Sequence, residues 1–373
     1  MKIKRKRRSR HRHRHRSRYR KPLLAFGLLL AIVLVLMAAY GAVREIGKSN
    51  LRKKAAAARP QMVQAKAQEL TEEEEAVWQE GWIKYQDRIY AYNEDILTFL
   101  FMGIDKGGDV AEVAEGTDGG QADALFLLIL NPHEKTIEVI GINRNTMADV
   151  DIYNEEGAYV TTATAQIAVQ HGFGNGVEES CEYQLKAVQR LFYNLPVHGY
   201  AAVHMDAVIS LTDLLGGIEL TALEDVGVAF EGKEKGKIII HEGDHVVLDG
   251  EKAYSYVRFR DVKVDGSADM RLKRQQQFLG EFIQKAKAQT AKDITLPVKM
   301  YQEITKQMVT DVTVDEVAYL ASTALDYRFD KSRFYSLEGE TIMGEKFEEF
   351  YVDEDVLYDM ILDIFYEPVD TQE

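Results

Sequence analysis

The sequence predicts an α/β protein in which a mixed β-sheet is packed with helices on both faces, in a three-layer-like arrangement. Residues 96–104 form a nearly continuous apolar run, which is typical of a strand buried on both faces. Residues 121–146 have the pattern of a β-hairpin, and strand-like and helix-like segments alternate from residue 197 onward. With 373 residues, of which 46% are hydrophobic, the chain can bury a large core.

The N-terminal region predicts a membrane anchor. Residues 1–21 contain 13 Lys and Arg and no acid, and the next segment, Leu23–Val43, has no charged side chain. Roughly 20 apolar residues span a bilayer, whereas a cleaved signal peptide has a shorter apolar core. We therefore expect one transmembrane helix over residues 22–43 of a single-pass cell-membrane protein. The basic flank places the tail, residues 1–21, in the cytoplasm and the rest of the chain outside.

The basic tail also raises the alternative of a nucleic-acid or metal partner. Because the whole chain has a formal net charge of −14, the residues after the tail carry −27. Positive charges beside His11, His13 and His15 disfavour a bound metal. An orientation signal that contacts anionic lipid head groups accounts for the tail, and no nucleic-acid partner is expected.

Residues 44–92 are predicted to form a membrane-proximal helical stalk. Thr71 followed by four glutamates is a favourable helix start, since acids at a helix N-terminus interact well with the helix dipole. We expect that helix to continue and pack through Trp78, Trp82 and Tyr85. A single extracytoplasmic domain then covers residues 93–368, with a short tail over residues 369–373.

The hairpin provides the first candidate site. Its apolar runs, residues 124–130 and 136–142, flank a five-residue linker that is too short for a helix. Antiparallel pairing about a centre near His133 and Glu134 places Asp123 opposite Arg144. A carboxylate and a guanidinium are thus expected to meet at one edge of the sheet.

Periodicity predicts the elements that follow. Cys181 falls on the apolar stripe of a helix over residues 179–195, which indicates a core residue rather than a nucleophile. The glycine-rich loop at residues 171–176 lacks the strand-then-helix setting of a dinucleotide site. Strands are expected over residues 197–205 and 218–223, and helices over residues 161–169, 206–215, 248–257, 269–289, 314–325 and 353–366.

Arginines are unexpectedly concentrated in three short segments of this acidic chain. Guanidinium groups match phosphate oxygens in bidentate geometry, which indicates a pyrophosphate site. Asp105 and Asp123 stand at strand ends, where carboxylate oxygens could bind Mg²⁺ or Mn²⁺. The alternative is that the arginines pair with the abundant surface acids. The arginines are Arg144, Arg258, Arg260, Arg271 and Arg274.

The ordered set of motifs resembles the LytR-CpsA-Psr family of membrane-anchored extracytoplasmic enzymes. No single motif is specific to the family, but the order of the motifs over about residues 95–290 is specific. Besides the N-terminal span, the matching pieces are Gly103–Asp105, Ala122-Asp123, Asn131-Pro132, Asn143–Thr146, Leu215–Gly217, Leu248–Ala253, Arg258–Arg260 and Arg271–Gln276.

This resemblance implies a phosphotransferase that attaches a polyprenyl-pyrophosphate-linked glycopolymer, such as teichoic acid or capsule, to peptidoglycan. By position, Asp123 and Arg144 are the expected catalytic residues, and Asp105 and Asp123 the expected metal ligands. The residues expected to bind the pyrophosphate are Arg144, Arg258, Arg260, Arg271 and Gln275.

Three positions depart from the family pattern. Gln121 stands where an arginine is usual, and Asn145 where an aspartate is usual. Asp269 precedes Arg271 by two residues instead of three. One positive and one negative charge are missing together, which leaves turnover in doubt. A non-catalytic polyprenyl-lipid-binding surface regulator or scaffold of envelope biogenesis is therefore the alternative function. A DNA-binding attenuator would rest on the basic tail alone.

Overall fold

The computed structural model describes residues 41–51, 53–54, 68–79, 81–113, 119–261, 264 and 266–369. Within these ranges no helix is both long enough and apolar enough to cross a bilayer. The predicted basic tail and all but the last three residues of the predicted transmembrane helix lie outside the described ranges.

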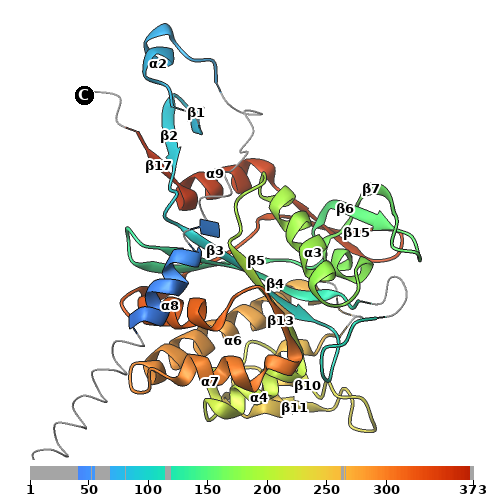
Figure 1. The fold of residues 1–373 in the computed structure, drawn as a ribbon. Coiled ribbons are helices and arrows are strands. Elements are labelled where there is room, and N and C mark those ends of the chain that lie inside the picture. Colours follow the sequence, from blue (N-terminus) through green and yellow to red (C-terminus); the bar gives the residue numbers. More distant parts are fainter. Residues whose placement is uncertain are drawn as a thin grey trace, which may run out of the picture.

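A six-stranded mixed sheet forms the centre of the domain (Figure 1), in the order β13-β8-β3-β4-β5-β14. Neighbouring strands β3, β4 and β5 are antiparallel, whereas β8 runs parallel to β3 and β14 runs parallel to β5. The predicted hairpin is confirmed, since Leu125 pairs with Ile142 and Asn131 pairs with Thr136. The strands are β3 (Leu97–Ile104), β4 (Ala122–Asn131), β5 (Thr136–Ile142), β8 (Gly199–His204), β13 (Met308–Thr310) and β14 (Arg328–Ser336).

Helices cover both faces of this sheet (Figure 1), which confirms a mixed α/β fold. On one face, Leu100, Met102, Leu125 and Leu127 are 0% exposed, because α3 (Glu178–Leu191) and α9 (Glu354–Phe365) pack against them. The other face lies toward four helices, and some of its side chains stay partly exposed. These helices are α4 (Asp206–Leu214), α6 (Ser267–Thr290), α7 (Leu296–Glu303) and α8 (Val314–Ala324).

The predicted packed helix through Trp82 and Tyr85 is wrong. Helix α2 (Glu72–Val77) begins at Thr71 with a capping box, as expected, but it is only six residues long. The chain then forms β1 (Trp82–Tyr85) and β2 (Arg88–Tyr92), which make a sheet with β17 (Tyr366–Pro368). Gln86 and Asp87, both at positive φ, form the tight turn. Pairing with β17, nearly 300 residues away in sequence, is invisible in the local pattern.

The helix expected over residues 161–169 is also wrong for most of its length. Residues Tyr159–Gln166 form β7, which pairs with β6 (Met147–Tyr153), and only the 3-10 helix η2 (Ile167–Phe173) is helical. The β-branched threonines in β7 favour a strand once a partner strand is present. Pairing with β6, which the local pattern does not reveal, therefore decides the strand conformation.

The remaining helix predictions are confirmed with small shifts of their ends. Helix α5 (Gly250–Arg258) starts at Asp249, whose side chain accepts a hydrogen bond from the Lys252 amide. Gly216 and Gly217 adopt positive φ angles just after α4, as a helix C-terminus favours. The smaller elements are β9 (Ile218–Thr221), β10 (Val226–Gly227), β11 (Ile238–Ile240), β12 (His245–Leu248), η3 (Thr305–Gln307), β15 (Gly339–Met343) and β16 (Glu348–Val352).

Cys181 lies in the core, as predicted, and we expect it to be unreactive in the native protein. Its thiol is buried, and burial raises the pKa of Cys181 to about 12, so very little thiolate forms at neutral pH. Iodoacetamide at pH 8 should therefore leave the folded protein unmodified by mass spectrometry and alkylate it once urea has unfolded it. Rapid labelling of the folded protein would contradict this prediction.

Candidate functional site

Three charged side chains meet at the open end of the β4–β5 hairpin. Arg144 Nε lies 2.8 Å from Asp123 Oδ1, and Arg271 Nη1 lies 3.1 Å from Asp123 Oδ2. The hairpin register brings Asp123 and Arg144 together, while α6 delivers Arg271 from 148 residues away. The predicted juxtaposition of Asp123 with Arg144 is confirmed.

Positive charge exceeds negative charge at this centre. Arg271 is 6% exposed, and its burial lowers the pKa of its guanidinium to about 10. Asp123 opposes that shift, whereas neighbouring Arg144 and Arg260 add to it. Arg271 Nη2 is buried and has no hydrogen-bond partner among the described residues. A buried donor without a partner is costly, so an anion that accepts its hydrogen bond would bind favourably here.

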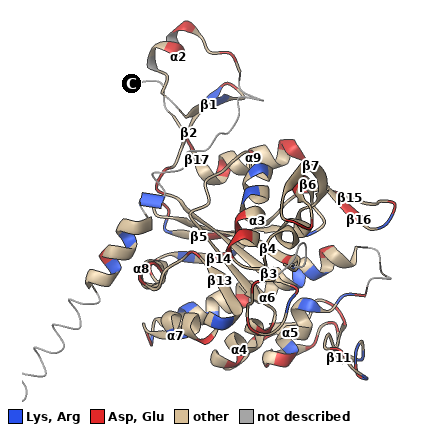
Figure 2. Cartoon of the chain, turned by 45° about the vertical axis from the view of Figure 1, so that its right-hand side comes forward, with Lys and Arg blue, Asp and Glu red and all other residues tan. Residues whose placement is uncertain are grey.

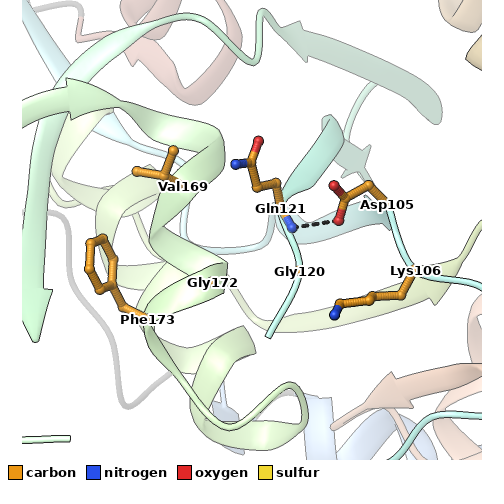
Figure 3. Close-up of a pocket in the computed structure, with 7 residues that line it drawn as sticks. All are labelled: Asp105, Lys106, Gly120, Gln121, Val169, Gly172 and Phe173. Carbon is orange, nitrogen blue, oxygen red and sulfur yellow. Dashed lines mark hydrogen bonds between the residues drawn. The ribbon is translucent and has the colours of Figure 1, made fainter. Parts of the chain in front are cut away.

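Gln121 connects this centre to Asp105. Its side-chain oxygen accepts a hydrogen bond from Arg144 Nη2, and its backbone N–H donates to Asp105 Oδ1 over 2.7 Å (Figure 3). The residue that departs from the family pattern is thus an uncharged partner of Arg144. Beside these residues lies a pocket of about 440 Å³. Its lining residues are Asp105, Lys106, Gly120, Gln121, Val169, Gly172 and Phe173 (Figure 3).

Asn145, which follows Arg144 in sequence, belongs to a second cluster with Arg260 and Glu348. Arg260 Nη2 lies 2.7 Å from Glu348 Oε2, and the same oxygen accepts from Asn145 Nδ2 over 3.3 Å. Glu348 is 8% exposed and also accepts from the backbone N–H of Gly266. The sequence reasoning missed Glu348, because it lies 203 residues from Asn145 and no local motif marks it.

Glu348 explains why an asparagine is suitable at position 145. An aspartate there would bring two buried carboxylates together, which disfavours the ionisation of both. Asn145 instead donates from its amide nitrogen to Glu348 and accepts from Gln166 Nε2 through its amide oxygen. The carboxylate that is missing at position 145 is therefore present nearby, supplied by β16.

The other two predicted pyrophosphate ligands are Arg258 on α5 and Gln275 on α6, and the side chain of each donates a hydrogen bond to a residue of α5. Arg258 Nη1 donates to Tyr254 on its own helix, and its guanidinium lies 5.3 Å from the centre of that ring. Gln275 Nε2 donates to the carbonyl of Val257 over 3.1 Å. No described contact joins Arg258 or Gln275 to Asp123, so their pyrophosphate role stays a prediction.

Arg274 holds the end of α5 against α6. Its Nε lies 2.6 Å from Glu224 Oε1, and its two terminal nitrogens donate to the carbonyl oxygens of Tyr256 and Phe259. Because these contacts use most of its donors, Arg274 positions the segment that carries Arg258 and Arg260. Acidic side chains lie on many other elements, including α2, α3 and α9 (Figure 2), so several arginines at one place stand out from the rest of the domain.

Asp105 and Asp123 are the candidate ligands of a divalent cation, and binding of that cation stays a prediction. No group of three or more His, Cys, Asp and Glu side chains that could hold a metal occurs in the part of the chain that the structure describes. Both oxygens of Asp123 face guanidinium groups, whereas Asp105 faces a backbone amide. Mg²⁺ commonly uses one or two carboxylates together with substrate phosphates, so Asp105 with Asp123 fits that donor set.

The chain is similar to known proteins of one family. The model of the LytR_cpsA_psr family matches residues 52–361. A polyisoprenyl-teichoic acid–peptidoglycan teichoic acid transferase, TagU of Enterococcus faecalis, is 26% identical over 273 residues, which is 71% of this chain and 77% of that protein. The TagU of Halalkalibacterium halodurans is also 26% identical, over 68% of this chain and 71% of that protein.

Solved structures share the fold. B. subtilis TagV superposes with a TM-score of 0.56 at 20% identity, covering 72% of this chain and 95% of that chain. TagT bound to LIIa-WTA gives a TM-score of 0.51 at 19% identity, covering 72% of this chain and 89% of that chain. The central mixed sheet and its helices are therefore those of a known architecture.

Proposed function

Since the chain belongs to the LytR-CpsA-Psr family, we propose that it is a membrane-anchored phosphotransferase of cell-wall biogenesis. It attaches a glycopolymer carried on a polyprenyl pyrophosphate, of the teichoic-acid or capsule type, to peptidoglycan. The observation that carries this proposal is the carboxylate of Asp123 between Arg144 and Arg271, whose buried Nη2 has no partner in the described chain. The names of the TagU relatives support the same donor and acceptor classes.

The proposed reaction is a phosphoryl transfer. A hydroxyl oxygen of peptidoglycan bonds to the phosphorus that carries the glycan, and the P–O bond to the lipid phosphate breaks. The lipid monophosphate leaves with that electron pair, and the hydroxyl proton is released. Arg144, Arg260 and Arg271 bind and orient the pyrophosphate. Because the fold already holds these guanidinium groups at the site, they stabilise the negative charge that develops in the transition state.

The lipid tail is proposed to bind on the sheet face that lies toward α6 and α8. Phe101 and Leu128 lie on central strands of this face, yet they stay partly exposed. On the opposite face the neighbouring Leu100 and Leu127 are completely buried. We propose that the polyprenyl chain occupies the incompletely packed space between the sheet and these helices.

Membrane anchoring through residues 22–43 remains part of the proposal. The helical segment 41–51 supports it, because Leu51 is buried against Phe99 and Tyr327 of the domain. The proposal places the N-terminus in the cytoplasm and this domain outside the cell. A chain docked in this way would hold the domain close to the bilayer that contains its lipid substrate.

We also propose that Asp105 and Asp123 hold Mg²⁺ or Mn²⁺ when the pyrophosphate binds. The cation would neutralise phosphate charge and polarise the bond that breaks. Chelation with EDTA is expected to lower the transfer rate at least about ten-fold, and added Mg²⁺ or Mn²⁺ should restore it. Asp105→Asn should raise the Mg²⁺ concentration that is needed, whereas the surface variant Asp293→Asn should not. A rate that EDTA leaves unchanged would remove the cation from the proposal.

The test of the function uses full-length protein in lipid nanodiscs with a synthetic polyprenyl-pyrophosphate disaccharide and peptidoglycan glycan strands. Wild-type protein should release polyprenyl monophosphate and add phosphodiester-linked sugar to the glycan. Arg271→Met should remove most of both products, because it removes the buried guanidinium while keeping a side chain of similar length. Absence of both products and of bound donor with the wild-type protein would refute the proposal.

The second candidate is a non-catalytic protein that binds polyprenyl lipid and regulates envelope assembly. The observation that favours it is the uncharged Gln121 beside Arg144. It predicts tight binding of the pyrophosphate lipid without release of monophosphate, and binding that Asp105→Asn leaves unchanged. Measuring binding and turnover on the same preparation separates the two candidates.

A further inference from the structure

We propose that the pocket between Asp105, Gln121, Val169 and Phe173 is the subsite for the acceptor saccharide. This pocket (Figure 3) measures about 440 Å³, within the roughly 300–1,000 Å³ typical of small-ligand sites. The inference rests on the proposed phosphotransferase function and specifies where its sugar acceptor binds. The ligand class is a hydroxyl-rich pyranose ring that presents a free hydroxyl.

The pocket and the proposed lipid space lie on opposite faces of the central sheet. Val169 and Phe173 belong to η2, whose Ile167 and Ala168 are buried on the side of the sheet that α3 covers. Helix α6 lies over the other face, where a Cβ on Gly141 would touch both Gln276 and Phe126. The ion-pair centre of Asp123 lies at the end of the central strands β4 and β5, where the hairpin opens.

This arrangement matches the geometry of phosphoryl transfer. The attacking and leaving oxygens lie roughly in line on opposite sides of the reacting phosphorus. If the lipid phosphate leaves toward the α6 face, the attacking hydroxyl must approach from the η2 face, where the pocket lies. The acceptor oxygen then forms its bond to phosphorus as the P–O bond to the lipid phosphate breaks, and the hydroxyl proton passes to water.

The walls of the pocket suit a sugar ring. Val169 and Phe173 of η2 contribute apolar side chains to the lining, and Asp105, Lys106 and Gln121 contribute polar ones. A pyranose has apolar C–H faces and a rim of hydroxyls, so the apolar side chains can pack on the ring and the polar ones can hydrogen-bond its rim. Gly120 adopts φ +82°, and a Cβ there would lie 2.8 Å from Lys106 Cγ, so this lining position favours glycine.

The test fills the pocket in the full-length protein. Val169→Phe places a ring in the space, and Val160→Phe, on the exposed strand β7, is the matched control. Initial rates are measured against soluble peptidoglycan oligosaccharide and against the polyprenyl-pyrophosphate disaccharide. Val169→Phe should raise the acceptor KM about ten-fold or more while the donor KM stays within about two-fold, and Val160→Phe should change neither.

Each other outcome overturns the assignment. A rise in the donor KM alone would place the donor glycan in the pocket, and unchanged constants would show that no sugar binds there. Phe173→Leu, which keeps an apolar wall but removes the ring, should raise the acceptor KM even if Val169→Phe does not fold. Saturation-transfer NMR with the oligosaccharide separates this inference from the proposed function. Binding to wild type that Val169→Phe abolishes supports the pocket even without turnover, and no binding alongside normal donor turnover refutes it.

Discussion

Asp123→Ala is expected to reduce glycopolymer transfer by about 10²–10³-fold or more, because it removes a charge that organises the reacting groups. It should also destabilise the domain, by at most about 3–5 kcal/mol, because the buried guanidinium of Arg271 would lose the carboxylate that it faces. Without Asp123, the guanidiniums of Arg144 and Arg271 face each other with no carboxylate between them. Urea unfolding and release of polyprenyl monophosphate measure the two effects.

A double variant separates stability from catalysis at this centre. Asp123→Leu with Arg271→Met replaces a charged pair by apolar groups, which commonly recovers much of the lost stability. We expect the double variant to be more stable than Asp123→Ala and equally inactive. Asp293→Ala, which removes an exposed partner of Lys299, should leave activity unchanged. Recovery of transfer in the double variant would show that the pair has no role in the reaction.

Moving the carboxylate between positions 348 and 145 is expected to have the second large effect. Asn145→Asp alone should cost about 1–3 kcal/mol, because it places a second buried carboxylate next to Glu348. Glu348→Gln alone leaves Arg260 without its counter-ion and should lower transfer about ten-fold or more, since Arg260 is a proposed pyrophosphate ligand. The double variant restores one carboxylate and should recover most of the stability and of the activity.

The pH dependence of unfolding gives an independent check of that prediction. Like-charge repulsion raises the pKa of a carboxyl in the folded Asn145→Asp variant above its unfolded value. The folded state then binds a proton more tightly than the unfolded state, so the stability deficit should shrink as the pH falls from about 7 to about 5. A deficit that does not depend on pH, or double-variant effects that simply add, would contradict the proposed charge repulsion.

The sequence predicted some residues of the site, but not all of them and not how they contact one another. The register of the hairpin places Asp123 beside Arg144, because a turn-rich linker of five residues leaves little freedom in how its strands pair. Arg271 could be recognised as a candidate through the ordered motifs, but its distance from Asp123 depends on how α6 packs. Glu348 could not be found at all, since its partners Arg260 and Asn145 lie 88 and 203 residues away.

The tertiary structure also separated arginines that look alike in the sequence. Arg274 is satisfied by Glu224 and by the carbonyls of Tyr256 and Phe259, and it positions the end of α5. Arg271, only three residues earlier, keeps a buried nitrogen without a partner in the described chain. Residues three apart lie on the same side of a helix, so spacing does not distinguish these two arginines. Only the packing of α6 determines that Arg274 meets carbonyl oxygens while Arg271 meets Asp123.

Local sequence patterns were sufficient to predict the family-like order of motifs, the strands of the central hairpin and most of the helices. These features depend on the spacing of apolar residues and on capping residues within short segments. Long-range packing, in contrast, makes strands of Trp82–Tyr85 and Tyr159–Gln166, brings Glu348 to Asn145 and forms the pocket beside Gln121. The physical reason is that each depends on partners distant in the chain, whose hydrogen bonds and charges outweigh weak local preferences.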